Sequence, residues 1–226
     1  MLGFLKDMIS AVREGASEGL AEAREEIDAE KAGKAAVAGK QAAALKTRLA
    51  LAPPMERLIT ALAAPYRETF LNELSTAADA KRQPVYLFCM DLPGDEVTSW
   101  QKLMARDFDV GSAEEAQAIT RALIENGDGA TNARCAVSLV RACHVAAGAA
   151  GIGYVDVPEA LAWATPAAVL AAKRFPSWYE YGQAFLLGER DAAGSNVLGR
   201  KFLARTVERL SNDDTSPWRV LAWPAA

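Results

Sequence analysis

The sequence predicts an all-α fold: a compact multi-helix globular domain of about eight to nine short helices, with an N-terminal helical arm. Along most of the 226-residue chain, apolar residues recur at the three- and four-residue spacing of one helix face. Helix-start signals and prolines placed in a first helical turn divide this pattern into short segments. Residues 85–90 alone have strand character. They lack a partner strand, so they are expected to form an extended connector or a buried helical turn.

Residues 1–50 are a charged, Ala-rich segment that differs in composition from the rest of the chain. Between positions 14 and 30 there are seven acids and one base, whereas residues 31–48 hold five bases and no acid. Gly33 and Gly39 lie near this switch in charge, which favours two helices joined by a loose hinge over one long helix or a disordered linker. Each exposed ion pair contributes roughly a few tenths of a kcal/mol, so the sorted charges bias the geometry rather than stabilise it.

The apolar face of residues 1–27 has three interpretations. It packs on the chain's own domain, docks on a partner protein, or makes weak contact with a membrane surface. Its polar face is acidic, whereas helices that lie on membranes usually carry basic polar faces. Packing on the domain is therefore favoured, and membrane contact is the least favoured of the three.

Residues 51–226 are expected to form the globular domain. Pro53 and Pro54 punctuate the chain at its start, and a helix with apolar residues at helical spacing follows them. Pro65 is expected to kink that helix or to start a new one, because proline has no N–H to donate inside a helix.

Capping signals predict the starts of the later helices. Three of them place a side-chain oxygen three residues before an acid, the spacing of a capping box. These three pairs are Ser112 with Glu115, Asp156 with Glu159, and Ser177 with Glu180. Thr131 or Asn132 is expected to start another helix, Thr165 and Pro166 a short one, and residues 194–196 the last long one.

A series of residues in the C-terminal half follows the pattern of a known family. They are Phe108, Asp109 and Val110 with residues 112–116, Arg134, residues 151–154, Phe175, Ser177, Trp178, Tyr181, Leu187, Gly188, Ser216, Pro217, Trp218, Leu221, Trp223 and Pro224. Over about residues 100–226, the chain resembles the bacterial family called domain of unknown function 1266, typified by the YbeU and YbeR proteins. The family often carries Trp-Asp before the central arginine and an aromatic residue soon after the Leu-Gly pair. This chain departs from both, at residues 131–133 and 191–193. The resemblance implies a helical fold and a bacterial cytosolic setting, and it brings no established activity.

Composition and charge narrow the class of protein. The net charge is −4, which argues against nucleic-acid binding, because that function usually needs a basic face. No apolar run reaches the roughly 18 residues of a membrane span, and the N-terminus lacks the pattern of a secretory signal. Cys89, Cys135 and Cys143 lack the spacing of a disulfide framework. A cytoplasmic protein in a reducing compartment is expected.

No catalytic residue, cofactor or metal site is predicted. His144 is the only histidine, so any Ser-His-Asp or Cys-His machinery must use it, and the adjacent Cys143 points about 100° away on a helix. One histidine and three scattered cysteines do not supply the convergent ligands of a zinc site. The glycines from Gly148 to Gly153 follow a helix rather than a strand, so they indicate a helix end and not a phosphate loop.

The tryptophan-rich C-terminal stretch admits two interpretations. Trp178, Trp218 and Trp223 are expected to pack together as a clamp that holds the irregular chain end on the domain, because large rings dominate core burial. Their neighbours form a candidate interaction surface, since aromatic residues and arginines are typical of binding hot spots. The candidate residues are Tyr179, Glu180, Tyr181, Arg190 and Asp191. The clamp is the favoured interpretation, and the two can share residues.

These observations favour a non-enzymatic protein-interaction module with a protein partner. Such a module neutralises a bacterial toxin, as an immunity protein does, or escorts a secretion-associated protein as an adaptor or chaperone. The alternative is a small-ligand-binding protein or an enzyme of unrecognised type. It would use a polar pocket near Arg134 and Tyr154 and the charged residues between Glu180 and Asp191.

Overall fold

The computed structural model describes part of the chain. The described residues are 24, 33, 47, 51–74, 88, 89, 92, 94–192, 196–214 and 216–224, with side chains for all but 70–74. The chain divides into two compact units, Met1–Ala44 and Leu45–Ala226, and the helices below belong to the second. Nearly all of the predicted arm of residues 1–50, with its apolar face of residues 1–27, and most of the strand-like residues 85–90 lie outside the described residues.

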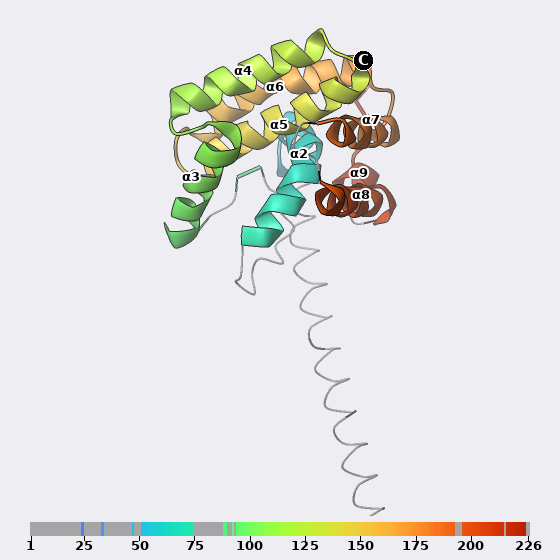
Figure 1. Ribbon diagram of the computed structural model, residues 1–226, viewed down its shortest axis with the longest axis horizontal. Coiled ribbons are helices and arrows are strands. Elements are labelled where there is room, and N and C mark those ends of the chain that lie inside the picture. Colours follow the sequence, from blue (N-terminus) through green and yellow to red (C-terminus); the bar gives the residue numbers. More distant parts are fainter. Residues whose placement is uncertain are drawn as a thin grey trace, which may run out of the picture. The chain divides into compact units, whose positions relative to one another are not determined.

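The described residues are all-α, as the sequence predicts, and none of them forms a strand. Within the described residues, seven helices have between 13 and 21 residues, and the short helix α9 has four. The long helices are fewer than the eight to nine short ones expected. In chain order, the described helices, long and short, are α2 (Pro54–Leu74), α3 (Gly94–Phe108), α4 (Ala113–Asp128), α5 (Asn132–Gly151), α6 (Val157–Arg174), α7 (Trp178–Arg190), α8 (Val197–Asn212) and α9 (Pro217–Val220) (Figure 1).

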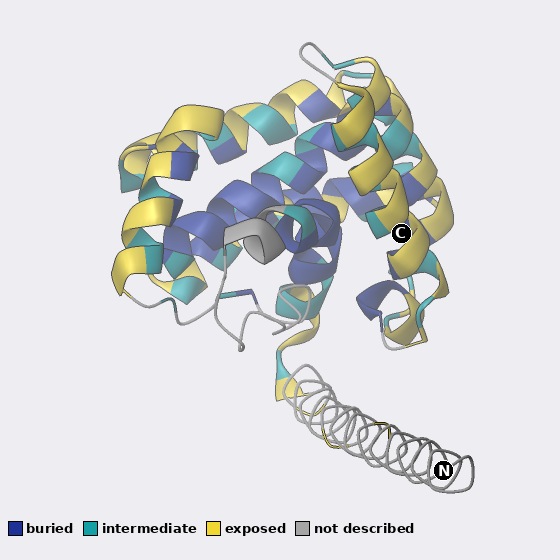
Figure 2. Cartoon of the chain, turned by 60° about the horizontal axis from the view of Figure 1, so that its bottom comes forward, coloured by how far each residue is buried: buried dark blue, intermediate teal, exposed yellow. Residues whose placement is uncertain are grey.

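Helix α5 is the centre of the fold, and α2, α4, α6 and α7 all pack against it. Fourteen of its 20 residues are buried, and most of these are Ala, Gly, Val or Cys. Figure 2 shows buried residues gathered on the central helices and exposed residues on the outward faces of the others. A helix that is apolar over most of its surface is stable only when that surface is covered, and small side chains let the four surrounding helices approach it closely.

The predicted caps are confirmed where the sequence places them. The Glu115 N–H donates to the Ser112 hydroxyl at 3.2 Å, and the Glu115 carboxylate accepts from the Gly111 N–H at 2.7 Å. The next four long helices also begin at a residue whose side chain accepts from a backbone N–H of the first turn. These caps are Thr131, Asp156, Ser177 and Asn196. Local hydrogen bonding therefore sets five helix starts.

Two prolines that are predicted to interrupt helices lie inside them. Pro65 is an interior residue of α2, so no new helix starts there. Pro166 is an interior residue of α6, so the separate short helix expected at Thr165 does not occur. An interior proline costs roughly 3 kcal/mol. Both helices bury apolar faces in the core, and that burial offsets the cost.

The carbonyl that Pro65 leaves without a helical donor is used by the C-terminal part of the chain. In a regular helix the N–H of residue 65 would donate to Ala61 O, and proline has no N–H. Instead, the indole Nε1–H of Trp218 donates to Ala61 O at 2.8 Å. Beside it, the hydroxyl of Tyr181 donates to Leu62 O at 3.1 Å. The middle of α2 thus anchors two aromatic side chains from α7 and α9.

Two glycines let α7 approach its neighbours. A Cβ atom on Gly188 would lie 2.3 Å from the carbonyl oxygen of Ala133 in α5. A Cβ atom on Gly182 would lie 2.9 Å from the ring of Trp218. Only glycine fits at Gly188 without moving the backbone, because the obstructing atom belongs to the main chain of α5.

We expect the hydrogen bond between Trp218 and Ala61 to be coupled to Pro65. Trp218→Phe leaves a buried carbonyl without a donor and should lower the free energy of unfolding by about 1–3 kcal/mol. In a Pro65→Ala background the N–H of residue 65 supplies that donor, so the same substitution should cost about 1 kcal/mol less. Urea unfolding of the four proteins measures both values. An equal cost in the two backgrounds would contradict the coupling.

Gly188→Ala should lower the free energy of unfolding by about 3 kcal/mol, because the added Cβ forces α7 away from α5. Gly129→Ala is the matched control, since Gly129 ends α4 with ordinary backbone angles and open space around its Cα. The control should change stability by about 0.5 kcal/mol or less. Thermal unfolding compares the two, and equal effects would show that close helix contact is not the constraint.

Candidate functional site

The three rings of the predicted clamp lie together. The rings of Trp178 and Trp218 are stacked with centroids 5.4 Å apart and planes 12° apart, and Trp223 meets Trp178 edge-on at 4.6 Å. The indole N–H of Trp178 donates to Leu221 O at 2.8 Å. This bond and the ring contacts hold the C-terminal tail (residues 221–224) against α7. The tail runs in an extended conformation from Leu221, so it depends on side-chain anchors rather than on a helical backbone ladder.

The structure separates the five residues of the predicted interaction surface. The side chain of Tyr179 is 64% exposed, and Glu180 is exposed beside it and completes the cap of α7 with Ser177. Tyr181 is fully buried, so its assignment to the surface is wrong. Its hydroxyl, which would be costly to bury alone, is satisfied by the carbonyl of Leu62.

The last two members of that surface lie at the opposite end of α7. Arg190 and Asp191 are exposed and pair with each other at 3.2 Å. Eleven residues of helix separate Tyr179 from Arg190, which corresponds to roughly 16 Å along the axis. The five residues therefore do not form one patch, and Tyr179 and Glu180 are the pair that lies near the clamp.

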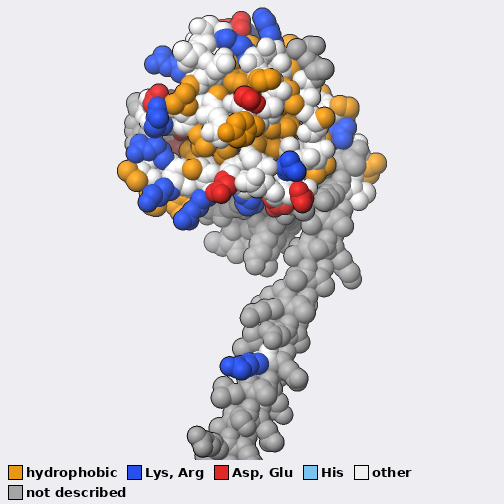
Figure 3. Space-filling view, turned by 90° about the vertical axis from the view of Figure 1, so that its right-hand side faces the viewer, with side chains coloured by type: hydrophobic (Ala, Val, Ile, Leu, Met, Phe, Trp, Pro, Cys, Tyr) orange, Lys and Arg blue, Asp and Glu red, His pale blue; other side chains and the backbone are white. Residues whose placement is uncertain are grey.

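An open groove of about 620 Å³ lies beside Tyr179, between α7, α8 and the tail. We call it the aromatic groove, because four of its lining side chains are Trp178, Tyr179, Trp218 and Trp223. Figure 3 looks onto the face formed by α7, α8 and α9, where apolar side chains gather at the centre and most basic ones lie toward the margins. The aromatic groove thus combines exposed ring surface with a charged border.

The polar groups of the aromatic groove suit contacts to main chain or side-chain amides. Gln183, Glu208 and Arg219 line its walls among the rings. The indole Nε1 of Trp223 has no hydrogen-bond partner among the described residues, but it is inaccessible to solvent and so offers no donor to a ligand. Arg219 has only a long contact of 3.7 Å to Asp214, and both side chains are exposed, so the guanidinium is available to a ligand.

The alternative polar pocket does not assemble. Arg134 lies in the first turn of α5, and Tyr154 lies just beyond its last residue. The length of this helix separates the two by roughly 30 Å. Arg134 is exposed, whereas Tyr154 packs against the apolar cluster around Trp100 and Met104. A single site that uses both residues is therefore excluded.

A polar contact between three helices went undetected in the sequence. The hydroxyl of Tyr66 in α2 donates to the carboxylate of Glu189 in α7 at 2.5 Å. Arg141 in α5 donates to that hydroxyl at 3.1 Å and to the same carboxylate at 3.3 Å. Burial, and then the negative charge of Glu189, raises the pKa of Tyr66 well above its ordinary value. The three groups satisfy one another, which indicates that they join α2, α5 and α7 rather than act on a substrate.

The only histidine lies in the core, as expected from the sequence. The rings of Tyr66, Trp100 and Phe108 surround the His144 ring with centroids between 5.3 and 5.7 Å away. Burial, and then the positive charge of Arg67, lowers the pKa of His144 to about 3. Burial also raises the pKa of the adjacent Cys143 thiol to about 12. Near neutral pH the buried Cys143 is therefore a protonated thiol and not a nucleophilic thiolate. The buried His144 has too low a pKa to act as a general base.

The depressed pKa of His144 predicts a pH dependence of stability. Between about pH 6.5 and pH 3 the unfolded chain binds a proton at His144 that the folded chain does not. Stability from this group is therefore complete above the unfolded pKa and falls as the pH is lowered. From pH 7 to pH 5 the loss should be about 2 kcal/mol.

Urea unfolding of the wild type and His144→Leu at both pH values isolates this effect. The carboxylates contribute to both proteins alike, so the difference between the two pH dependences belongs to the histidine. The variant should lose about 2 kcal/mol less than the wild type between pH 7 and pH 5. Identical pH dependences would refute a neutral, enclosed His144.

The described part of the chain holds neither a cluster of potential metal ligands nor a helix that could span a membrane. Its His, Cys, Asp and Glu side chains form no group of three that could hold a metal ion. None of its helices is both long and apolar enough to span a membrane. Cys135 and Cys143 are buried free thiols.

The fold and the site define an all-α domain with an open aromatic groove. The chain belongs to the family described as "Protein of unknown function (DUF1266)", whose model matches residues 11–223. The match extends well beyond the residues 100–226 expected from the sequence and includes most of the N-terminal segment. The comparisons found no similar curated protein and no similar solved structure.

Proposed function

We propose that this protein is a non-enzymatic protein-interaction module that binds its partner in the aromatic groove. The observation that supports this most is the exposure of Tyr179, at 64%, beside the rings of Trp178 and Trp223. A large ring gains apolar contact on leaving water and loses little conformational entropy on binding, which makes exposed Tyr and Trp typical of binding hot spots. Tyr179 is not needed for the clamp, whose rings pack without it.

Further apolar side chains on α8 extend the surface available to a partner. Val197, Leu198 and Phe202 are all about half exposed or more. They lie within six residues near the start of α8, the helix that also lines the aromatic groove. A partner that covers both would bury considerably more apolar area than the groove alone provides.

In its narrower form, the proposal is that the partner is a bacterial toxin that the chain neutralises or a secretion-associated protein that it escorts. The net charge of −4 favours a partner with a basic surface, since complementary charge speeds association. The free thiols of Cys135 and Cys143 favour a reducing compartment such as the cytoplasm. The enclosed positions of Cys143 and His144 favour a binding role over an enzymatic one.

Site-specific photocrosslinking tests the proposal. With p-benzoylphenylalanine in place of Tyr179, irradiation of native host cells should give one discrete protein adduct. The same probe in place of Val169, which is 59% exposed on α6, is the control and should give none. Tyr179→Ala should reduce recovery of that partner at least about tenfold, the loss expected of a hot spot, while thermal stability stays unchanged.

Equal labelling at the two positions, or unchanged recovery with Tyr179→Ala, would contradict binding in the aromatic groove. Mass spectrometry of the adduct then identifies the partner class. An adduct with a toxin or a secreted protein supports the narrower proposal, and an adduct with neither refutes it.

A further inference from the structure

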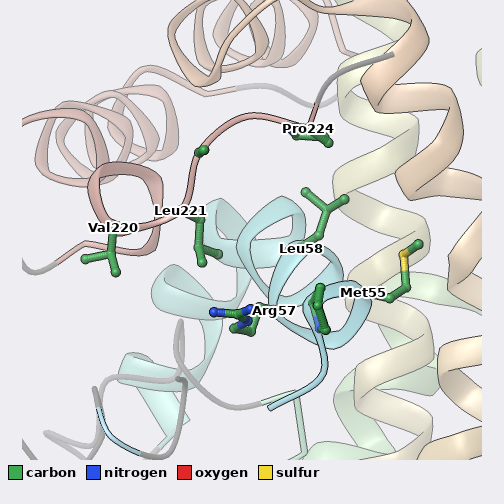
Figure 4. A pocket seen from close by; sticks show the side chains of 8 residues that line it. Met55, Arg57, Leu58, Val220, Leu221 and Pro224 are labelled. Carbon is green, nitrogen blue, oxygen red and sulfur yellow. The ribbon is translucent and has the colours of Figure 1, made fainter. Parts of the chain in front are cut away.

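A second groove lies between the first turns of α2 and the C-terminal tail. It has a volume of about 450 Å³, within the range of roughly 300–1,000 Å³ that small-molecule sites occupy. Its lining is apolar apart from one side chain, Arg57. Figure 4 shows Arg57 extending from α2 toward Val220 and Leu221, while Leu58 points toward Pro224. We call this second site the arginine groove.

The tail separates the two grooves, because its successive residues line the two grooves in turn. Trp223 lines the aromatic groove, whereas Ala222 and Pro224 line the arginine groove, and Leu221 contributes to both. Successive side chains of an extended chain point in opposite directions, so the one tail can form a wall of both grooves. The arginine groove is therefore distinct from the surface proposed for the protein partner.

Arg57 is a half-buried side chain whose guanidinium has no counter-charge among the described residues. Its Nε atom is inaccessible to solvent and has no hydrogen-bond partner in the described part of the chain. No described carboxylate forms an ion pair with it, and the neighbouring Glu56 does not line the groove. Because an unpaired, partly desolvated charge is costly, an anionic group would gain a strong charge-assisted hydrogen bond here.

We infer that the arginine groove binds a monocarboxylate with an unbranched apolar chain, such as a free fatty acid. The carboxylate would pair with Arg57, and the alkyl chain would lie against Met55, Leu58, Leu221 and Pro224. A peptide fits this site poorly, because its amides need hydrogen bonds and the lining side chains offer no polar group besides Arg57. An alkyl chain needs none.

Calorimetric titration of the full chain with hexanoate, octanoate and decanoate tests the inference. Saturable binding with 1:1 stoichiometry is expected, and affinity should rise by up to about fourfold for each CH₂ that enters the groove. Decanol supplies the tail without the charge and acetate the charge without the tail, so both should bind at least about tenfold more weakly than decanoate.

Variants locate the site and separate it from the aromatic groove. Arg57→Met keeps the length of the side chain but removes the charge, and it should weaken decanoate at least about tenfold while leaving decanol unchanged. Ala222→Trp fills the groove without altering Arg57, and it should also abolish binding. Arg121→Met, at an exposed arginine of α4, and Tyr179→Ala should leave the affinity for decanoate unchanged.

The inference fails if decanoate does not saturate below its micelle concentration, or if Arg57→Met binds it as well as the wild type does. It also fails if a short apolar peptide with a free C-terminal carboxylate binds more tightly than decanoate. Thermal unfolding checks that each variant is folded. Since Tyr179→Ala affects only the aromatic groove, the two proposals can fail independently.

Discussion

The hydrogen bond from Trp218 to the Ala61 carbonyl is the contact on which the C-terminal architecture depends. Pro65 creates the acceptor by removing its helical donor, and Trp218 fills it from α9, 157 residues later in the chain. Trp178 stacks on that indole and in turn holds Leu221 O. The helical hydrogen bond that Pro65 cannot form thus fixes the position of the tail, and the tail forms a wall of both grooves.

Close packing around α5 and α7 explains why this arrangement has a single geometry. Gly188 brings the main chain of α7 against that of α5, and Gly182 makes room for the Trp218 ring. With α7 fixed in this way, Trp178 and Tyr181 fall on its inward face, three residues apart. Tyr179 follows Trp178 at about 100° around the helix, so the same packing that buries two rings leaves the third in water.

The features predicted correctly from the sequence are those that depend on interactions between residues close together in the chain. The all-α class and the caps at Ser112, Asp156 and Ser177 follow from hydrogen bonds within a few residues, and the structure confirms them. The continuity of α2 through Pro65 could not be predicted, because the compensating donor comes from the other end of the chain.

The candidate site was predicted less completely than the fold, for the same reason. The sequence assigned Trp178 to the clamp but Tyr181, three residues later, to the interaction surface, and the assignment of Tyr181 is wrong because its side chain is fully buried. Only the three-dimensional path of the tail identified which face is buried. The contact between Tyr66 and Glu189, 123 residues apart, and the isolation of Arg57 in an apolar groove have no local signature.

The alternation of the tail also determines which residues can report on each site. Leu221 lines both grooves and accepts the Trp178 hydrogen bond, so any change there disturbs the clamp and both sites together. Arg57 and Tyr179 each line one groove only and stand on different helices. Neither residue contributes a ring to the clamp. Changing Arg57 therefore alters only the arginine groove, and changing Tyr179 alters only the aromatic groove, while the tail between them stays in place.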